Sequence, residues 1–381
     1  MGMDVRGDFG LAPDRIWLNT SHQGALPLVS AEAARRAVEW KLRPHEMTTA
    51  RFGEVPRELK RSIGRLIDVS GEDIILTNGA SYGLHLLANG LPLAAGDEVL
   101  LMAGDFPSNL LPWRAAAERG VRVKLLKPHD EVLSPQEIEE ALTPRTKLVC
   151  LSWVHSFSGR ELDIIAIGER CRQNGTWFAV NVSQALGARP MPVGAYPVDA
   201  IFSVGWKWLC GPYATGFAWL RRPLRETLRY NQAYWQAAQN EASLRGENPE
   251  FTVPRADEAR RYDVFGTANF FNFLPLTASI DYLLDLGLDR IQAHVHGLAE
   301  RLADGLDRSK FELISDTDDA TRTSLVLFRH EDPQRQETIQ RSLAEEGIDV
   351  ALRMGRLRVS AHLYNVPADI DRTLAVLHAV A

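Results

Sequence analysis

Cysteine is scarce in this sequence: Cys150, Cys171 and Cys210 are the only three among 381 residues. Because their number is odd and no two of them form a CxxC pair, neither a disulfide framework nor a thiolate zinc site is predicted. Long apolar runs are also missing, since no stretch approaches the roughly 18 residues of a membrane span. The first ten residues contain charged side chains and lack the apolar core of a secretion signal, so we expect a cytoplasmic protein without membrane contact.

An excess of positive charge is absent as well. The chain has 43 Lys and Arg residues against 49 Asp and Glu residues, a net charge of -6, so no basic surface for nucleic acid is expected. The ten histidines are scattered, and His294 and His296 point to different faces of a predicted helix, so no metal site is predicted. The length corresponds to about two to three domains, most plausibly one large and one smaller.

From residue 70 onward, short β-rich runs alternate with helical patterns, which predicts an α/β fold whose mainly parallel sheet is covered by helices. The apolar runs that we interpret as its seven strands span residues 74–77, 98–102, 121–125, 148–152, 177–180, 200–203 and 216–220. The segment 221–262 is polar and has few strand signals, so we expect helices and an exposed segment there. A helical pattern from Leu274 to Leu302, interrupted at Gly287, predicts an inter-domain helix. Strands at 324–328 and 357–360, with helices around 333–346 and 367–380, then predict a small α+β domain.

Three segments carry candidate chemistry. The first, Gly79-Ala80-Ser81, joins a strand to a helix predicted from Tyr82. Free N–H groups in the first turn of a helix suit a phosphate, but Ser81 is also a common helix cap, and capping alone would explain it. The second segment runs from Asn181 to Gln184, where a buried strand ends. Ligands of open α/β sheets bind at such strand ends, whereas turn chemistry is the simpler explanation.

The third segment places Lys207 among aromatic and apolar residues between Ser203 and Pro212. An apolar setting and a nearby cation disfavour the ammonium form, so the amine becomes available for Schiff-base chemistry. A lysine whose stem covers apolar surface is the alternative explanation. Cys210 is interpreted as a small packed hydrophobe.

Taken in this order and spacing, these segments resemble the class V aminotransferase family, which consists of pyridoxal-phosphate enzymes of fold type I. The resemblance covers roughly residues 15 to 375 and rests on Gly79-Ala80-Ser81, Asp105-Phe106-Pro107-Ser108-Asn109, Asn181 to Gln184, Lys207 to Pro212, Gly266-Thr267-Ala268-Asn269, and Leu357-Arg358-Val359-Ser360 with Tyr364-Asn365. It implies an N-terminal segment (1–25) associated with the small domain, a large cofactor-binding domain (26–262) and a small C-terminal domain (263–381).

The resemblance also implies roles for individual residues. Lys207 would form the Schiff base with pyridoxal 5'-phosphate, and Arg358 would bind the substrate carboxylate, with which we also associate His22. A homodimer is implied too, with the active site at its interface. The residues expected to bind the cofactor are Gly79, Ala80 and Ser81 at the phosphate, Phe106 stacked on the ring, Asn181 at the ring nitrogen, Gln184 at the 3-oxygen, Ser203 and Trp206 beside Lys207, and Thr267 at the phosphate of the partner subunit.

Some positions depart from the family pattern. Asn181 stands where the family has an aspartate, and a neutral amide does not favour the protonated ring as a carboxylate does. Val204 and Trp206 replace the Ser and His that some relatives place against the phosphate, and Ser203 lies one position off. The segment before Arg358 contains no cysteine, so persulfide chemistry of the desulfurase type is not expected.

Chemistry at Cα or Cβ of an amino acid remains: transamination, epimerisation, β-elimination, or decarboxylation with loss of the amine. The pattern is most similar to the isopenicillin-N-epimerase-like branch, including enzymes of secondary metabolism that process cysteine S-conjugates, as in lincosamide antibiotic biosynthesis. A non-catalytic binding protein of this fold is the alternative from another class, but the joint presence of Lys207, Gln184 and Arg358 argues against it. A nucleotide-binding α/β protein lacks its phosphate fingerprint here.

Overall fold

The computed structural model describes residues 3–229, 234–238, 253–318 and 321–380. Its larger part is built on a seven-stranded sheet with the order β2-β8-β7-β6-β5-β3-β4. These strands are β2 (Ile74–Thr77), β3 (Glu98–Met102), β4 (Arg122–Leu126), β5 (Thr146–Ser152), β6 (Trp177–Asn181), β7 (Ala200–Val204) and β8 (Gly216–Leu220). The pairs from β7 to β4 are parallel, while β8 is antiparallel to both β2 and β7. The predicted α/β fold with a mainly parallel sheet is therefore confirmed.

Helices cover both faces of this sheet because successive strand residues are apolar toward both sides. Ile75 and Leu101 face a cluster with Leu84 and Trp113, while the neighbouring Leu76 belongs to the cluster of the opposite face. Near-continuous apolar strands are what a sheet buried on both faces requires. The helices of this part are α1 (Leu28–Leu42), α2 (Thr49–Ile67), α3 (Ala80–Gly90), α4 (Pro107–Ala117), α5 (Pro135–Ala141), α6 (Ile164–Asn174), α7 (Arg222–Thr227) and α8 (Trp235–Ala238).

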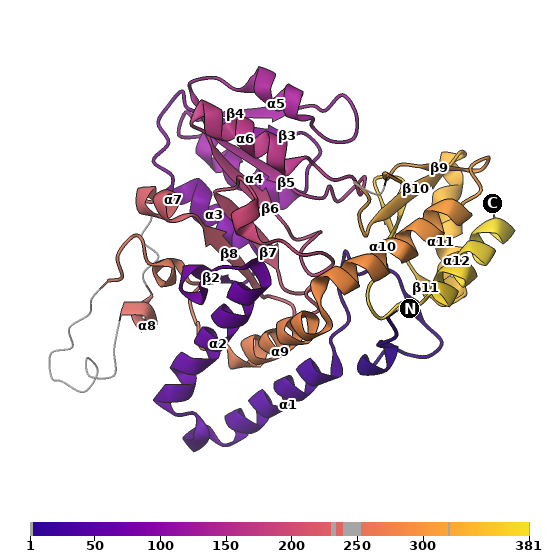
Figure 1. Cartoon of the computed structure of the whole chain (residues 1–381), viewed down its shortest axis with the longest axis horizontal. Helices are drawn as coiled ribbons and strands as arrows, with labels where there is room; N and C mark the ends of the chain where they lie inside the picture. Colours follow the sequence, from indigo (N-terminus) through magenta and orange to yellow (C-terminus); the bar gives the residue numbers. More distant parts are fainter. Residues whose placement is uncertain (1–2, 230–233, 239–252, 319–320, 381) are drawn as a thin grey trace.

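The long helical pattern forms two helices, α9 (Phe270–Leu286) and α10 (Leu288–Gly305), which meet at Gly287. Gly287 has a φ of 88°, a conformation that glycine adopts readily. α9 packs against α1 and α2, whereas α10 packs against α12 (Pro367–Val380) at the other end of the molecule. Figure 1 shows this pair of helices in orange, running from the large part to the small one.

The smaller part carries a four-stranded antiparallel sheet in the order β12-β13-β10-β9. Its elements are β9 (Phe311–Leu313), β10 (Val326–His330), α11 (Gln336–Glu345), β12 (Ala351–Arg353) and β13 (Arg356–Val359). The N-terminal β1 (Ile16–Trp17) pairs in parallel with β11 (Ile348–Asp349), so the start of the chain lies against this part.

Several local details differ from the sequence prediction. The helix expected from Tyr82 begins at Ala80, so Ser81 lies in its first turn and is not its cap. The strand expected at 324–328 is shifted to 326–330, and β12 was not anticipated. Part of the polar segment 221–262 forms α7, α8 and a short 3-10 helix at Ala259–Tyr262, while residues 230–233 and 239–252 lie outside the described part. Among the described helices, none is both long and apolar enough for a membrane span.

Candidate active site

Most of the predicted site residues meet at a cavity of about 690 Å³ at the carboxyl ends of the central strands. The ends of β2, β3, β5, β6 and β7 and the loops after them provide most of its wall, and the hairpin of β12 and β13 and His22 from the N-terminal segment add the rest. The lining residues are His22, Asn78, Gly79, Ala80, Ser81, Phe106, Ser108, Ser152, Ser156, Phe157, Asn181, Ser183, Gln184, Val204, Trp206, Lys207, Tyr213, Ala214, Arg353 and Arg358.

The start of α3 forms one end of this cavity. Gly79 precedes the helix with a φ of 154°, and a Cβ at this position would lie 3.1 Å from the Trp206 ring. Both the backbone conformation and the space therefore require glycine there. The exposed Ser81 and the first-turn N–H groups of α3 offer donors at the positive end of the helix dipole.

Lys207 lies in the middle of the cavity wall, on the loop between β7 and β8. Its Nζ is 5.3 Å from the centroid of the Phe106 ring. Burial and, secondarily, the Arg358 charge lower the pKa of the Lys207 amine to about 7. Much of the amine is therefore neutral near neutral pH, which supports the nucleophile prediction over that of a lysine that only covers apolar surface.

A chain of polar side chains fixes the orientation of Asn181. Asp105, which is 3% exposed, accepts a hydrogen bond from the Asn109 amide nitrogen at 2.8 Å, so the Asn109 carbonyl oxygen faces Asn181. Asn181 donates to that oxygen through Nδ2 at 2.9 Å, and its own Oδ1 accepts from the Ser183 N–H at 3.1 Å. Because a carboxylate accepts only, Asp105 sets the direction of both amides.

Gln184 is oriented in a similar way. The Trp208 indole N–H donates to Gln184 Oε1 at 3.1 Å, which leaves the amide nitrogen as the group near the cavity. That nitrogen donates to the Ser21 carbonyl at 3.2 Å and to Ser156 Oγ at 3.3 Å. Both N–H groups of this amide are engaged, so donation to the oxyanion for which the sequence predicted it would replace the 3.3 Å contact with Ser156 Oγ.

Arg358 forms the substrate side of the cavity from β13. It is 3% exposed, and among the described residues its hydrogen-bond partner is the Ser156 carbonyl, 3.3 Å from a guanidinium nitrogen. Within the described part of the chain, its Nε is buried without a partner. Burial, and secondarily Arg353, lower its pKa to about 10, so it stays charged at neutral pH. An unsatisfied buried guanidinium is suited to bind a carboxylate bidentately. His22 lies at the same side, and partial burial together with Arg353, Arg358 and Lys207 lowers its pKa.

Two predicted cofactor residues do not line the cavity. Ser203 is fully buried and donates to the Val204 carbonyl at 3.2 Å, so its side chain points elsewhere. The hydroxyl near the Lys207 loop belongs instead to Ser183, which accepts from the Val204 N–H at 3.2 Å. Thr267 is half-buried in the loop before α9 and does not line this cavity either, so its contact with a partner subunit stays a prediction.

Sequence reasoning missed several lining residues. Ser156 and Phe157 belong to the loop after β5, a strand end that could have been examined as the end of β6 was. Phe157 stacks on Phe106, with ring centroids 6.1 Å apart. Arg353 gave no such signal, because only the pairing of β12 with β13 brings it beside Arg358. In the part of the chain that is described, no cluster of His, Cys, Asp and Glu could hold a metal ion.

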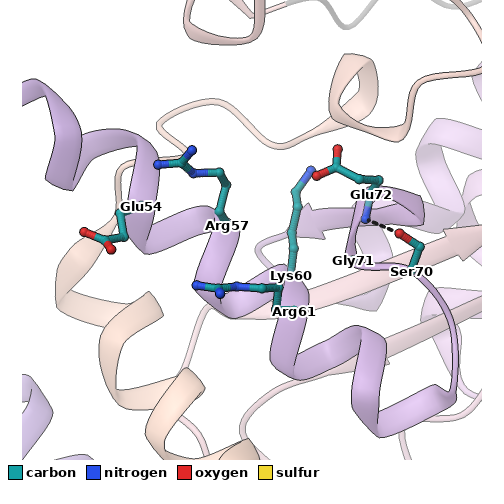
Figure 2. Close-up of a pocket in the computed structure, with 7 residues that line it drawn as sticks. All are labelled: Glu54, Arg57, Lys60, Arg61, Ser70, Gly71 and Glu72. Carbon is teal, nitrogen blue, oxygen red and sulfur yellow. Dashed lines mark hydrogen bonds between the residues drawn. The ribbon is translucent and has the colours of Figure 1, made fainter.

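A second hollow, of about 420 Å³, lies between α2 and the turn that follows it. Figure 2 shows Arg57, Lys60 and Arg61 extending from α2, with the end of Lys60 beside Glu72 and the two arginines directed away from the turn. Acidic and basic side chains both line it, and the Lys60 ammonium pairs with Asp263 at 2.8 Å. This hollow contains none of the predicted site residues.

Pyridoxal 5'-phosphate fits the cavity around Lys207 in each of its parts. The Lys207 amine suits its aldehyde, the Phe106 ring suits its pyridine ring, and the N–H groups of α3 suit its phosphate. The Arg358 guanidinium, which has one 3.3 Å contact to the Ser156 carbonyl and an unpartnered Nε, suits the carboxylate of an amino acid beside it. The fold and this cavity are those of a pyridoxal-phosphate-dependent enzyme of fold type I.

The sequence matches the family Aminotransferase class-V over residues 42–372, and the chain belongs to this family. A probable cysteine desulfurase of Methanothermobacter thermautotrophicus is 28% identical over 313 residues, which cover 78% of this chain and 74% of the relative. The isopenicillin N epimerase of Streptomyces clavuligerus is 26% identical over 396 residues, which cover 99% of this chain and 98% of the relative.

Two solved structures share the fold. One is the cystine C-S lyase C-DES in complex with its reaction product cysteine persulfide, with a TM-score of 0.87, 22% identity, and coverage of 96% of this chain and 97% of that chain. The other is a cysteine desulfurase from Thermococcus onnurineus NA1, with a TM-score of 0.87, 22% identity, and coverage of 100% and 98%.

Proposed function

We propose that this enzyme acts at Cα or Cβ of an amino acid through a Schiff base on Lys207, with β-elimination from an S-substituted cysteine as the first candidate reaction. The observation that carries the proposal is the position of Lys207, whose pKa is lowered to about 7, in one cavity with Phe106 and with Arg358, whose Nε has no partner. Transamination, epimerisation and decarboxylating deamination are the other candidate reactions.

The cofactor, when bound, supplies an electron sink for negative charge at Cα. The chain supplies the rest. Arg358 holds the substrate carboxylate and so orients the bonds of Cα, and the Lys207 amine exchanges protons at Cα. A general base is most efficient when its pKa lies near the working pH, and the value of about 7 for Lys207 meets this condition. Phe106 and Phe157 stack on each other and form an apolar part of the cavity wall.

The thiols of the chain favour reactions that need no protein persulfide. Cys150, Cys171 and Cys210 are all buried, and burial raises the pKa of each thiol far above neutral pH. None of them lines the cavity. A lyase can release the sulfur group of its substrate without such a thiol, and the shared fold with a cystine C-S lyase supports this choice.

The neutral group at position 181 supports elimination over general transamination. Asn181 is held by Asn109 and Ser183 and has no carboxylate with which to keep a ring nitrogen protonated. A cofactor ring that is not kept protonated would be a weaker electron sink, and this disfavours reactions in which negative charge stays at Cα for long. A leaving group at Cβ removes that charge directly. A role in secondary metabolism is part of this proposal, and the match to isopenicillin N epimerases over nearly their whole length supports it.

A homodimer is also part of the proposal. Phe265 and Phe271 lie on either side of Thr267, and their side chains are 61% and 42% exposed. Large exposed aromatic residues are enriched in the buried centres of protein interfaces. A second copy that covers these rings would bring Thr267 to the active site of its partner, as the family resemblance implies.

The test incubates purified holoenzyme with S-substituted cysteines and, separately, with L-alanine. Elimination predicts stoichiometric pyruvate, ammonia and thiol from the cysteine derivative, identified by mass spectrometry. The Lys207→Ala variant must lose this activity and the borohydride-fixed adduct at this position. Keto acid that retains the sulfur group would favour transamination, and an adduct on another lysine would contradict the site.

A further inference from the structure

The charge on the cavity wall is one-sided. Among its twenty lining residues no aspartate or glutamate occurs, while His22, Lys207, Arg353 and Arg358 are basic. Lys207 is engaged by the cofactor and Arg358 by the carboxylate of an amino acid in the proposed function. Arg353 then remains as a permanent positive charge that neither role uses.

The hairpin of β12 and β13 places three arginines on one face. Arg358 lies opposite Ala351, and Arg353 lies opposite Arg356. Directly opposite residues and residues two apart in a strand point to the same side, so Arg353 and Arg358 are diagonal neighbours. Such neighbours have Cβ atoms roughly 7–8 Å apart, a span that one substrate molecule bridges with its two ends.

The three arginines differ in their partners. Arg356 forms two contacts with the Glu131 carboxylate, at 2.6 and 2.8 Å, and a third with the Phe157 carbonyl at 2.8 Å. Arg353 contacts only the carbonyl of its own neighbour Leu352, at 2.8 Å, and no described residue forms an ion pair with it. Like charges that face each other on a sheet are destabilising, and Glu131 compensates only Arg356, so Arg353 is the arginine of this face that is left to bind an anion.

The backbone holds Arg353 in place at the mouth of the cavity. The strand ends at Arg353, and the turn that follows consists of Met354 and Gly355 with φ values of 51° and 71°. Two successive residues with positive φ form the tight turn that matches the twist of a hairpin. Together with the anchor from Arg356 to Glu131, this turn fixes the base of the Arg353 side chain relative to the large domain.

We propose that Arg353 binds a second carboxylate of the substrate, so that the substrate is an amino acid whose side chain ends in a carboxylate. This inference rests on the proposed function, because it needs Arg358 to hold the α-carboxylate. Arg358 is buried and Arg353 is exposed, so the two ends of the substrate meet different surroundings. The side-chain contact is therefore screened by salt, while the contact to the α-carboxylate is screened much less.

The experiment compares S-carboxymethyl-L-cysteine with its isosteric amide, S-carbamoylmethyl-L-cysteine. Each is titrated into the holoenzyme, and the dissociation constant is obtained from the absorption change of the bound cofactor. Hydrogen bonds to charged groups contribute roughly 1.5–3 kcal/mol, so the acid should bind about tenfold or more tightly than the amide. The Arg353→Gln variant should reduce this preference to below about threefold, and Arg353→Lys should retain part of it.

Arg329→Gln is the matched control, because it removes an exposed arginine from β10 of the same sheet, where it pairs with Glu312. This variant should keep the full preference for the acid, and added salt should lower that preference in the unmodified enzyme. The inference is overturned if the unmodified enzyme does not prefer the acid over the amide, or if Arg353→Gln keeps that preference. In both cases, binding of the amide would still uphold the proposed function. If neither compound binds or reacts, both are overturned.

Discussion

Replacing Asn181 with aspartate introduces the carboxylate that the family pattern has at this position, and the structure predicts an immediate cost. Asn181 is 6% exposed, and its Nδ2 donates to Asn109 Oδ1 at 2.9 Å. Asn109 cannot reverse its amide, because Asp105 and Ser152 Oγ both accept from its nitrogen at 2.8 Å. The variant leaves the Asn109 oxygen facing another oxygen, and a buried acceptor without a donor costs about 1–3 kcal/mol.

The cost should depend on pH. Burial raises the pKa of the new carboxyl above its unfolded value near 4, and protonation would restore a donor to Asn109. Between the two pKa values the folded state binds more protons than the unfolded state, so stability falls as pH rises through this window. The deficit of Asn181→Asp is therefore largest above the folded pKa and smallest at pH 4.

The cofactor should reverse part of this effect. A carboxylate near the ring nitrogen favours the protonated ring, so the variant should recover stability when pyridoxal 5'-phosphate binds and should exchange the Cα proton of simple amino acids faster. Half-transamination should increase and the fidelity to the native reaction should fall. Urea unfolding at pH 4 and pH 7, with and without cofactor, measures stability, and proton NMR in deuterium oxide measures the exchange.

The control is Asn89→Asp, which adds the same charge at an exposed position of α3. It should leave the exchange rate unchanged and lower the stability by no more than about 1 kcal/mol, the upper value for an exposed carboxylate near the C-terminus of a helix, and this loss should not depend on the cofactor. If cofactor-free Asn181→Asp is as stable as the unmodified protein, the orientation of Asn181 by Asp105 is refuted. Equal exchange rates would refute the role of Asn181 in selecting the reaction.

Three further predictions concern the cavity and the dimer. Cofactor-free protein mixed with pyridoxal 5'-phosphate should form the borohydride-fixed adduct at a rate that rises with pH through about 7 and then levels off, because the Lys207 amine loses its proton there. A rise in rate centred near pH 10 would contradict the lowered pKa of Lys207. Arg358→Ala should weaken binding of amino acids by roughly 2–5 kcal/mol while cofactor binding persists, and equal affinity of the unmodified enzyme for an amino acid and its decarboxylated amine would refute this role. Phe271→Glu should shift sedimentation toward monomer and reduce cofactor retention through loss of the Thr267 contact, whereas a fully active monomer would exclude that contact.

Much of the fold could be predicted from local patterns in the sequence. The apolar runs of β3 and β5 are continuous because both faces of the sheet are covered, and this signal needs no knowledge of the strand order. The order of the motifs also indicated the family, since a Gly-Ala-Ser turn, a strand ending in Asn181 and a lysine loop follow one another as in its members. Strand ends were sufficient to place Gly79, Gln184 and Lys207 at one cavity.

Ser203 shows where local reasoning failed. Its place near Lys207 in the sequence suggested a cofactor contact, but strand residues alternate in direction, and its side chain is buried away from the cavity. Ser183, from a different strand end, provides the hydroxyl beside this loop. A difference of one position in a strand decides which side a residue faces, and only the register of β7 against β6 fixes that position.

The sequence by itself determined the sheet, the order of the motifs and the lysine, because these depend on periodicity and chemistry within short segments. Tertiary structure alone decided the orientation of Asn181 and the position of Arg353 diagonal to Arg358 at the cavity. Asn109 is 72 residues from Asn181, and Arg356 is 225 residues from the Glu131 that anchors the hairpin. Contacts over such distances arise only when strands pair and the two parts of the molecule pack together, and local patterns carry no record of which residues will then meet.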